Sequence, residues 1–385
     1  MKIIFFHDNV ITVREQFLFS SGSLNSKVIS RYLELSDKFS LATRKDNSRS
    51  TENLTLVGSL KDLNHFSLPN LSSFKLQNLI KCYIDLSKLI YENNFMIIRL
   101  PSLIGLLALY VAKKQHKNYL IELVGCPLDS YRLHSFIGKI ISIPMYFITR
   151  YYVKNAESVL YVTDSFLQNR YPTNTSQQIG CSDVELVIDN KVLAKRIEKI
   201  DSKSKDDFVR IGMIGFLEAK YKGFETALKA LSLIKKKGNT NYFLEIVGGG
   251  NSLYITNLVK ELGLDNQVNI IGVLSHPNGV FNWLDSIDIY LQPSSTEGMP
   301  RALIEAMSRA CACIGSNAGE IPELLEYNHV HKKNDFKKLS QSILELSDLS
   351  TMKLNSKNKF LKSKEFNKKI LDKKRYSFYN KSINY

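Results

Sequence analysis

The sequence predicts an α/β protein built from two doubly wound domains that face each other across a cleft. Short apolar runs of strand length alternate with longer amphipathic runs along the chain, which is typical of βαβ units and a parallel sheet. The alternation stops in a polar, charged segment at residues 189–207 and then restarts. A chain of 385 residues also exceeds the roughly 100–200 residues of one ordinary domain.

The first half begins with a buried strand, a polar loop that contains Gly22, and an amphipathic helix. We assign residues 1–200 to this N-terminal domain. Its expected strands are residues 2–7, 39–42, 96–100, 120–124 and 158–162, and its expected helices are residues 24–35, 74–91 and 103–114.

The second half repeats the strand–helix order, and we assign residues 201–360 to it. Ligands of such open sheets bind beyond the carboxyl ends of the strands, so this edge is the expected site. The expected strands are residues 209–214, 243–247, 268–271, 287–292 and 312–316, and the expected helices are residues 224–237, 254–262, 279–286 and 300–310.

The charge of the chain favours anionic partners. Lys and Arg number 52 against 37 Asp and Glu, a net charge of +15, which attracts nucleic acid, anionic lipid or phosphorylated small molecules. A merely soluble basic protein is the alternative. We expect no nucleic-acid partner, because no DNA- or RNA-binding motif accompanies the charge. The five scattered cysteines form no disulfide framework or zinc-knuckle spacing, so we expect a reducing, cytoplasmic location and no metal.

Two further absences bear on the location. The N-terminal segment meets His7 and Asp8 after a short apolar run, so we expect no signal peptide. The longest apolar stretches, residues 97–112 and 136–149, are each broken by a charge and a proline, so we expect no membrane span.

The most informative segment is residues 288–309. A buried strand stops at Pro293, a polar loop ends in Glu297-Gly298, and Pro300 suits the first position of the next helix. The first N–H groups of that helix form an anion site, and Glu305 lies about one and a half turns inside it. In a nucleotide sugar the diphosphate lies between the sugar and the ribose. In this segment the helix N-terminus lies between the carboxylates of Glu297 and Glu305, so the two orders match. Alternatively, Glu297 only caps the helix and Glu305 is a solvated helix residue.

This segment resembles the Glu–seven residues–Glu signature of the family-4 retaining glycosyltransferases, which have the GT-B fold of two Rossmann-like domains. The likeness continues through residues 316–325 and back through Gly215, Lys222-Gly223 and residues 244–250. Residues 161–172 are similar to segments of bacterial capsule, O-antigen and lipopolysaccharide sugar transferases.

The resemblance implies roles for individual residues. Glu297 would contact the donor sugar, Glu305 the ribose, and Lys222 the diphosphate, where a lysine neutralises a leaving phosphate. A surface residue in a lysine-rich loop is the alternative for Lys222. The remaining donor-binding candidates form the turn over the sugar or lie beside it: Gly215, Gly298, Met299 with its N–H, Pro300, Arg301, Lys220 and Gly22, for which a plain turn is equally open.

The sequence departs from the family pattern at two positions. Phe216 stands where the family usually has an arginine, so Lys220 and Arg301 are the candidates for a second charge. The family's histidine at an N-domain strand end is missing from residues 121–129, and Asp129 is the candidate to replace it. Arg99 is a second possible acceptor-side residue.

The function implied is transfer of a hexose from a UDP- or GDP-linked sugar to a hydroxyl of a glycan acceptor in cell-surface polysaccharide synthesis. Configuration would be retained, without metal or cofactor. A basic, apolar segment at residues 132–154 suits a lipid-linked acceptor on the inner face of the plasma membrane, or is an ordinary core helix. Residues 361–385 would form a basic helix that crosses back to the N-terminal domain. The alternatives are a non-catalytic GT-B subunit that binds a membrane or partner transferase, and a GT-B epimerase.

Overall fold

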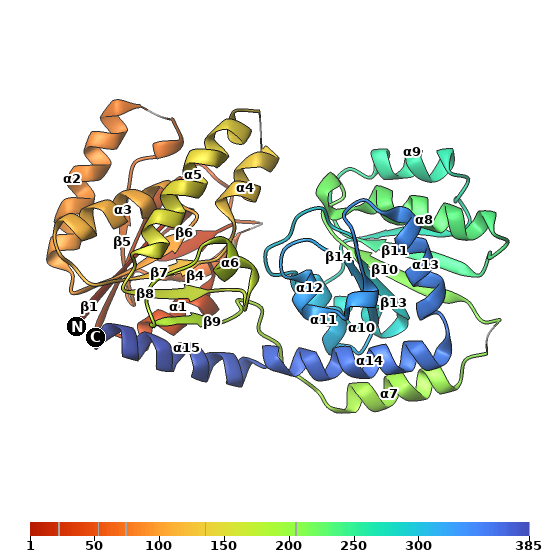
Figure 1. Ribbon diagram of the computed structural model, residues 1–385. Coiled ribbons are helices and arrows are strands. Elements are labelled where there is room, and N and C mark those ends of the chain that lie inside the picture. The colour runs from red at the N-terminus through yellow and green to blue at the C-terminus, as the bar shows by residue number, and fades with distance from the viewer. Residues whose placement is uncertain (22–23, 53, 74, 135, 205, 385) are drawn as a thin grey trace. The chain divides into compact units, whose positions relative to one another are not determined.

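The computed structural model describes residues 1–384 apart from 22, 23, 53, 74, 135 and 205, so the candidate Gly22 lies outside the described residues. The chain forms two compact units (Figure 1). Unit 1 comprises Met1–Asp183 together with Asp372–Tyr385, and unit 2 comprises Val184–Leu371.

Unit 1 is built on a mostly parallel sheet with strand order β4-β2-β1-β6-β7-β8-β9, in which β3 joins β1 to β5. Only the β1–β2 and β2–β4 pairings recorded in this sheet are antiparallel. The strands are β1 (Lys2–Arg14), β2 (Phe17–Ser20), β3 (Lys38–Lys45), β4 (Thr55–Ser59), β5 (Asn64–Ser67), β6 (Phe95–Leu100), β7 (Tyr119–Leu123), β8 (Ser158–Tyr161) and β9 (Gln178–Gly180).

The first strand is longer than the sequence pattern predicted. Residues 2–6 pair in parallel with β3, and residues 3–6 also pair with β6. The strand continues to Arg14, pairs with β3 again at Val10 and Ile11, and turns back into β2 as a hairpin. The segment Val10-Ile-Thr-Val13 is β-branched throughout, and such residues favour extended backbone over loop. The polar stretch that contains Gly22 therefore follows β2, and not the first strand, along the chain.

Helices cover the sheet of unit 1. They are α1 (Ser26–Leu33), α2 (Leu76–Glu92), α3 (Leu103–Lys114), α4 (Pro127–His134), α5 (Phe136–Lys154) and α6 (Phe166–Arg170). The start of α3 is fixed by two side chains: Asp8 accepts from the N–H groups of Leu103 and Ile104, and Ser102 Oγ accepts from Gly105 N–H at 2.8 Å. Within the described part of the chain, no helix combines the length and apolar character needed to cross a bilayer.

The last helix, α15 (Lys368–Ile383), is anchored to unit 1 by buried polar contacts. Tyr379 OH donates to the Glu122 carboxylate, which also accepts from Tyr32 OH at 2.9 Å. Arg375 donates to the Ser182 carbonyl at 2.6 Å. Burying an unpaired carboxylate would be costly, so these donors fix where α15 lies on unit 1.

Unit 2 contains a parallel sheet with strand order β12-β11-β10-β13-β14-β15. The order reverses between β10 and β13, and the crevice beyond the carboxyl ends at such a switch point is where open α/β sheets bind ligands. The strands are β10 (Val209–Ile214), β11 (Tyr242–Val247), β12 (Val268–Gly272), β13 (Ile289–Gln292), β14 (Ala312–Ser316) and β15 (Val330–His331).

The helices of unit 2 pack apolar residues against both faces of this sheet. They are α7 (Lys191–Asp201), α8 (Phe224–Lys236), α9 (Leu253–Glu261), α10 (Asn278–Ser286), α11 (Arg301–Ser308), α12 (Ile321–Leu324), α13 (Phe336–Leu346) and α14 (Leu349–Ser363). A short 3-10 turn, Lys220–Lys222, precedes α8.

The boundary between the units lies after Asp183, earlier than the expected boundary after residue 200. The polar segment that looked like a linker is α7, and it belongs to unit 2. Its Arg196 is buried and donates to the carbonyl groups of Leu284, Ile287 and Arg309. Leu284 lies in the last turn of α10, Ile287 follows α10, and Arg309 follows α11. The polar helix α7 is therefore held in unit 2 by the hydrogen bonds of its buried arginine.

Candidate functional site

The loops after β10 and β13 meet at the carboxyl edge of the unit 2 sheet. Ser295 N–H donates to the Tyr221 carbonyl at 2.7 Å, which ties the two loops together. Gly223 has a φ of +80°, and a Cβ there would lie 2.2 Å from the Pro293 carbonyl oxygen. Only glycine permits both this backbone conformation and this close approach.

Glu297 lies at the centre of the contacts at this edge. Its Oε1 accepts from Lys222 Nζ at 2.7 Å, from Gln292 Nε2 at 2.8 Å and from Ser294 Oγ at 2.8 Å. The Glu297 side chain is 9% exposed and that of Lys222 is 21% exposed, so the ion pair is largely withdrawn from water. Charge-assisted hydrogen bonds of this kind hold both side chains in one geometry.

Tyr290 supports this network from the interior. Its OH donates to Gln292 Oε1 at 3.1 Å, which orients the amide nitrogen of Gln292 toward Glu297. Burial raises the pKa of Tyr290 well above its ordinary value, and the charges of Glu297 and Glu305 add to the effect. Tyr290 is therefore a neutral donor, and both carboxylates lie near it.

The loop after β14 completes the arrangement. Gly319 has a φ of +55°, and a Cβ there would lie 2.1 Å from the Glu297 carbonyl oxygen. Glu320 N–H donates to the Gly298 carbonyl at 3.3 Å. The backbone of Glu297-Gly298 is thus held between the loops that follow β13 and β14, whereas a Cβ on Gly298 itself would meet nothing within 4 Å.

Glu305 is a buried residue of α11 and not a solvated one. Its side chain is 5% exposed, and its Oε1 lies 3.1 Å from Nε2 of His276, which is 54% exposed. His276 follows β12, so it reaches the same edge of the sheet from another loop. The sequence interpretation missed His276, although a His-Pro pair in the loop between an expected strand and the next expected helix was a usable signal.

The turn before α11 differs from the expectation. Pro300 has a ψ of 84° and precedes the helix, which begins at Arg301 and ends at Ser308 instead of spanning residues 300–310. Arg301 N–H bonds the Met299 carbonyl at 3.0 Å, so the chain makes a turn where a first helical residue was expected. Arg301 is exposed and Met299 is partly buried.

The residues proposed to supply a second positive charge do not join the Glu297 network. The Lys220 ammonium lies 5.0 Å from the centre of the Tyr254 ring, on α9, which draws it to a different surface. Phe216 is 54% exposed, and a Cβ on Gly250 would lie 2.8 Å from its ring. Gly215 packs against the stem of Lys222, with 3.0 Å between its ideal Cβ and Lys222 Cγ.

The two candidates in unit 1 have structural partners. Arg99 is 4% exposed, pairs with Glu122 at 2.9 Å and lies 3.7 Å from Asp183. Its charge is paired inside the unit, and its acceptor-side role stays a prediction. Asp129 forms an ion pair with Arg170 at 2.6 Å and is 27% exposed, so a carboxylate is present there but already neutralised.

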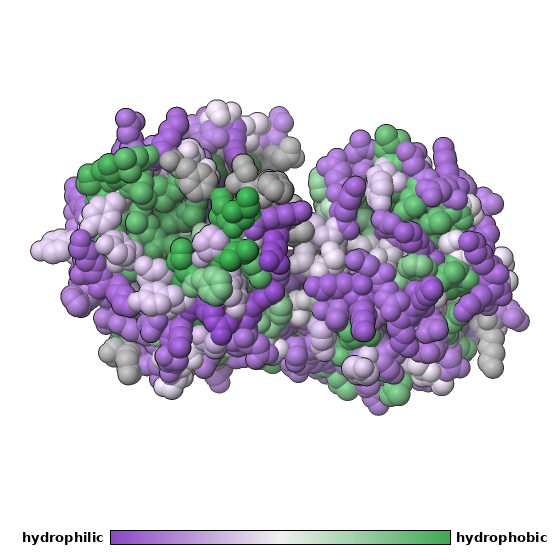
Figure 2. Space-filling model, turned by 45° about the horizontal axis from the view of Figure 1, so that its top comes forward, coloured by the Kyte–Doolittle hydropathy of each residue, from purple (hydrophilic) through white to green (hydrophobic). Residues whose placement is uncertain are grey.

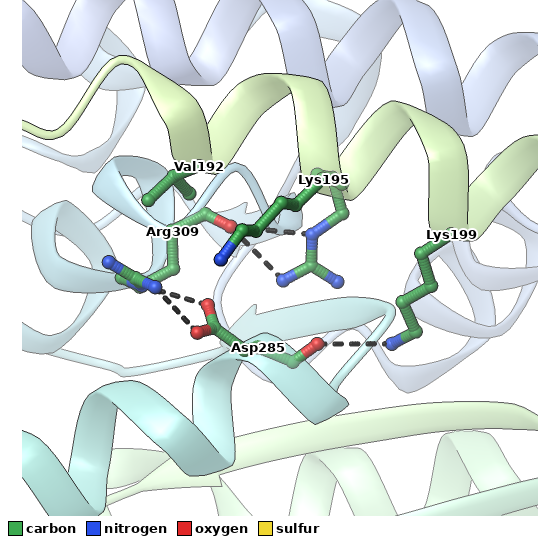
Figure 3. A pocket seen from close by; sticks show the side chains of 6 residues that line it. Val192, Lys195, Lys199, Asp285 and Arg309 are labelled. Carbon is green, nitrogen blue, oxygen red and sulfur yellow. Dashed lines mark hydrogen bonds and ion pairs between the residues drawn. The ribbon is translucent and has the colours of Figure 1, made fainter.

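A small basic pocket of about 90 Å³ lies beside α7 and is lined by Val192, Lys195, Arg196, Lys199, Asp285 and Arg309. Arg196 donates to the main-chain carbonyl of Arg309. Figure 3 shows that Lys199 donates to the main-chain carbonyl of Asp285 and that Arg309 pairs with the Asp285 carboxylate, at 2.8 Å for the Nε contact. These cations hold helix ends together, so the pocket is a structural feature of unit 2.

The chain is similar to known proteins over both its units. Residues 194–362 match the family described as glycosyl transferases group 1. Protein CapJ from Staphylococcus aureus is 31% identical over 348 residues, which is 89% of this chain and 85% of CapJ. The capsular polysaccharide biosynthesis glycosyltransferase CapH from the same organism is 31% identical over 134 residues, 34% of this chain and 36% of CapH.

Two solved structures illustrate the likeness in fold. The lipopolysaccharide outer core galactosyltransferase WaaB, in its apo form, has a TM-score of 0.67 at 16% identity and covers 100% of this chain and 99% of its own. HepE from Anabaena in complex with UDP-glucose has a TM-score of 0.64 at 14% identity and covers 99% of this chain and 100% of its own. At these identities the likeness concerns the fold alone.

Proposed function

Because the chain belongs to the glycosyl transferases of group 1, we propose that it transfers a sugar from a nucleoside-diphosphate donor to a hydroxyl group of a glycan acceptor. The predicted GT-B fold, with two Rossmann-like domains, is confirmed by the solved structures that it resembles. The names of relatives that act in capsular and amylovoran synthesis support a role in making a cell-surface polysaccharide.

The ion pair between Lys222 and Glu297 carries the proposal. Three loops interlock around it at the switch point of the sheet, where α/β proteins bind ligands. An ion pair that only stabilises the fold does not require closely packed glycines, a helix N-terminus and a second buried carboxylate beside it. The complexes of HepE with UDP and UDP-glucose support a nucleotide sugar as the donor, which we propose to be UDP- or GDP-linked.

In the proposed complex, Glu297 Oε2 accepts hydrogen bonds from sugar hydroxyls while Oε1 keeps its protein donors. Lys222 Nζ lies 2.7 Å from that carboxylate, so it is already placed beside the sugar and can contact the adjoining phosphate. The negative charge on the leaving nucleoside diphosphate grows as the sugar departs, and a positioned ammonium group stabilises that charge more than it stabilises the bound donor.

Glu305 and His276 would hold the nucleoside end of the donor. A buried carboxylate accepts two hydroxyl hydrogen bonds well, and His276 fixes its orientation from the loop after β12. The N–H groups at the start of α11 lie in the chain between the two glutamates and would face the diphosphate.

Three finer features belong to the same proposal. The anomeric configuration is retained, the reaction needs no metal ion because Lys222 and main-chain N–H groups neutralise the diphosphate, and the acceptor is linked to a lipid on the cytoplasmic face of the membrane. A product with the donor's anomeric configuration, read by NMR, would support retention. Activity that persists in excess EDTA would support metal independence. Loss of activity in EDTA would contradict metal independence.

The central test combines nucleotide binding with transfer. Titration calorimetry with UDP and with GDP identifies the donor class. Glu297→Gln should lower the rate of transfer about 100-fold, because the charged acceptor at the sugar is lost. Lys229→Ala is the matched control, since Lys229 also pairs with a glutamate, Glu225, but on the surface of α8. If neither nucleotide binds and no transfer occurs, the chain is a non-catalytic subunit instead.

A further inference from the structure

Three neighbouring helices of unit 1 expose large apolar side chains, between 43% and 74% exposed, and Figure 2 shows hydrophobic residues gathered on this unit. Single apolar residues scattered over a surface are common, but a group of them on neighbouring helices indicates an interaction site. We call this surface the α2–α5 face. It consists of Leu76, Leu79, Ile80, Ile84 and Tyr91 on α2, Tyr110 on α3, and Ile140, Ile143, Phe147, Ile148 and Tyr151 on α5.

The exposed residues form stripes that are separate from the core-facing stripes. On α5, Ile140, Ile143, Phe147 and Tyr151 recur at spacings of three and four residues, while Val153 of the same helix is buried. On α2 a second set with helical spacing is exposed, although Cys82, Leu86, Leu89 and Ile90 already face the core. A helix that only covers a sheet needs one apolar stripe, so the second stripe indicates a second apolar environment.

Lysine–tyrosine pairs line one end of this face. Lys113 Nζ lies 5.1 Å from the ring centre of Tyr151, and Lys114 Nζ lies 5.7 Å from that of Tyr83 and donates to its OH at 3.1 Å. Lys117 Nζ lies 5.6 Å from the ring centre of Tyr91. Tyrosine and lysine both have an apolar body and a polar tip, which suits the headgroup layer of a bilayer.

The polarity of the face is graded along the helices. The helices α2 and α5 end just before the amino ends of β6 and β8, so their first residues lie toward the carboxyl edge of the unit 1 sheet. The aliphatic residues occupy the first two-thirds of α2 and α5. Tyr91 and Tyr151 lie in the last turns of these helices, their lysine partners lie at the end of α3 or just after it, and the Lys114–Tyr83 pair lies midway along α2. The face is therefore most apolar toward the carboxyl edge of the sheet and most cationic toward its amino edge.

We propose that unit 1 docks on an anionic lipid bilayer through the α2–α5 face. The aliphatic side chains enter the outer acyl region, and the ammonium groups of the lysine–tyrosine pairs contact lipid phosphates. This orientation turns the carboxyl edge of the unit 1 sheet toward the membrane. The charged residues exposed on these helices favour an anionic surface: Lys81, Lys88, Lys113, Lys114, Lys139 and Lys154 against Glu92, with Lys117 and Asp85 half-buried.

The proposal goes beyond sugar transfer, because binding to vesicles can be measured without donor or acceptor. The full chain is floated with vesicles of phosphatidylcholine, with or without about 30% phosphatidylglycerol. We expect binding to the anionic vesicles only, with a partition coefficient that falls as salt rises.

Variants then locate the contact. Replacing Ile143 and Phe147 with aspartate should lower the partition coefficient at least about tenfold, because two charges would enter the acyl boundary. Leu354→Asp with Leu361→Asp is the matched control, since these α14 residues of unit 2 are 61% and 48% exposed. It should bind as the unaltered chain does. Replacing Lys113 with glutamine should weaken binding about fivefold, and only to anionic vesicles.

Three results would overturn the proposal: no binding of the unaltered chain to anionic vesicles, binding that the α5 variant leaves unchanged, or light scattering that shows the face joining two copies of the chain. Thermal unfolding of each variant checks that it is folded. Titration with UDP and GDP in the same preparations keeps the two proposals separate, because the proposed nucleotide site consists of residues of unit 2 and the α2–α5 face consists of residues of unit 1.

Discussion

Replacing Lys222 with alanine tests the proposed chemistry most directly. The change removes one ammonium group that is 21% exposed and lies 2.7 Å from Glu297 Oε1. Loss of one positioned donor to a developing anion costs about 2.7–4 kcal/mol, or 100- to 1,000-fold in kcat. Because Lys222 is partly exposed, water replaces some of the lost stabilisation, so we expect a reduction near the lower end, about 100-fold.

The same change should affect stability far less than rate. Glu297 keeps its hydrogen bonds from Gln292 and Ser294, so the free energy of unfolding should fall by only about 1–2 kcal/mol. UDP carries more negative charge on its terminal phosphate than a UDP-linked sugar does. Lys222→Ala should therefore weaken binding of the free nucleoside diphosphate more than binding of the intact donor.

The assay measures kcat at saturating donor, the Kd of the nucleotide by calorimetry, and unfolding in urea. Lys229→Ala should leave all three within about twofold, because Lys229 is 41% exposed on α8 and its pair with Glu225 is a surface pair. A Lys222→Ala protein that stays folded and keeps its kcat within threefold would refute the assigned role. A double change with Glu297→Gln should cost less than the sum of the single changes, because the two residues act as a pair.

Three other predictions concern the fold that holds the site. Gly223→Ala should abolish nucleotide binding because its Cβ would lie 2.2 Å from a carbonyl oxygen, whereas Gly238→Ala, with a φ of +90° and nothing within 4 Å, should cost only about 1 kcal/mol in urea unfolding. Tyr379→Phe should lower the free energy of unfolding by about 1–3 kcal/mol, because a buried carboxylate loses a donor, while Tyr376→Phe, 48% exposed, should have almost no effect. Burial, aided by the charge of a nearby arginine, lowers the pKa of His7 from 6.5 to about 4. Between these pH values the unfolded chain binds a proton that the folded chain does not, so this group should make stability fall as the pH drops through the window, by an amount on the order of 2–3 kcal/mol. His7→Gln should remove this contribution and leave that of His65, whose pKa burial also lowers to about 4.

Local pattern was enough to predict most of unit 2. The strands predicted there begin and end within a few residues of the predicted ranges, because short apolar runs between glycine-rich and proline-containing turns leave few alternatives, whereas β15 was not predicted. The same pattern failed at the N-terminus, where β1 continues into a hairpin. Glycine, proline or a cluster of charges usually marks a strand end, and residues 8–14 carry no glycine or proline, only Asp8 and Asn9 and one terminal arginine.

The sequence by itself determined which residues of unit 2 could form a site, because the order of strand ends, loops and helices along the chain places Lys222, Glu297 and Glu305 on one edge of a parallel sheet. Only the tertiary structure decided which charges remain available there. Whether a charged side chain is available depends on partners distant in sequence: Glu122 takes Arg99, and His276 reaches Glu305 from another loop. Such pairings depend on how strands and helices pack, which no local periodicity encodes.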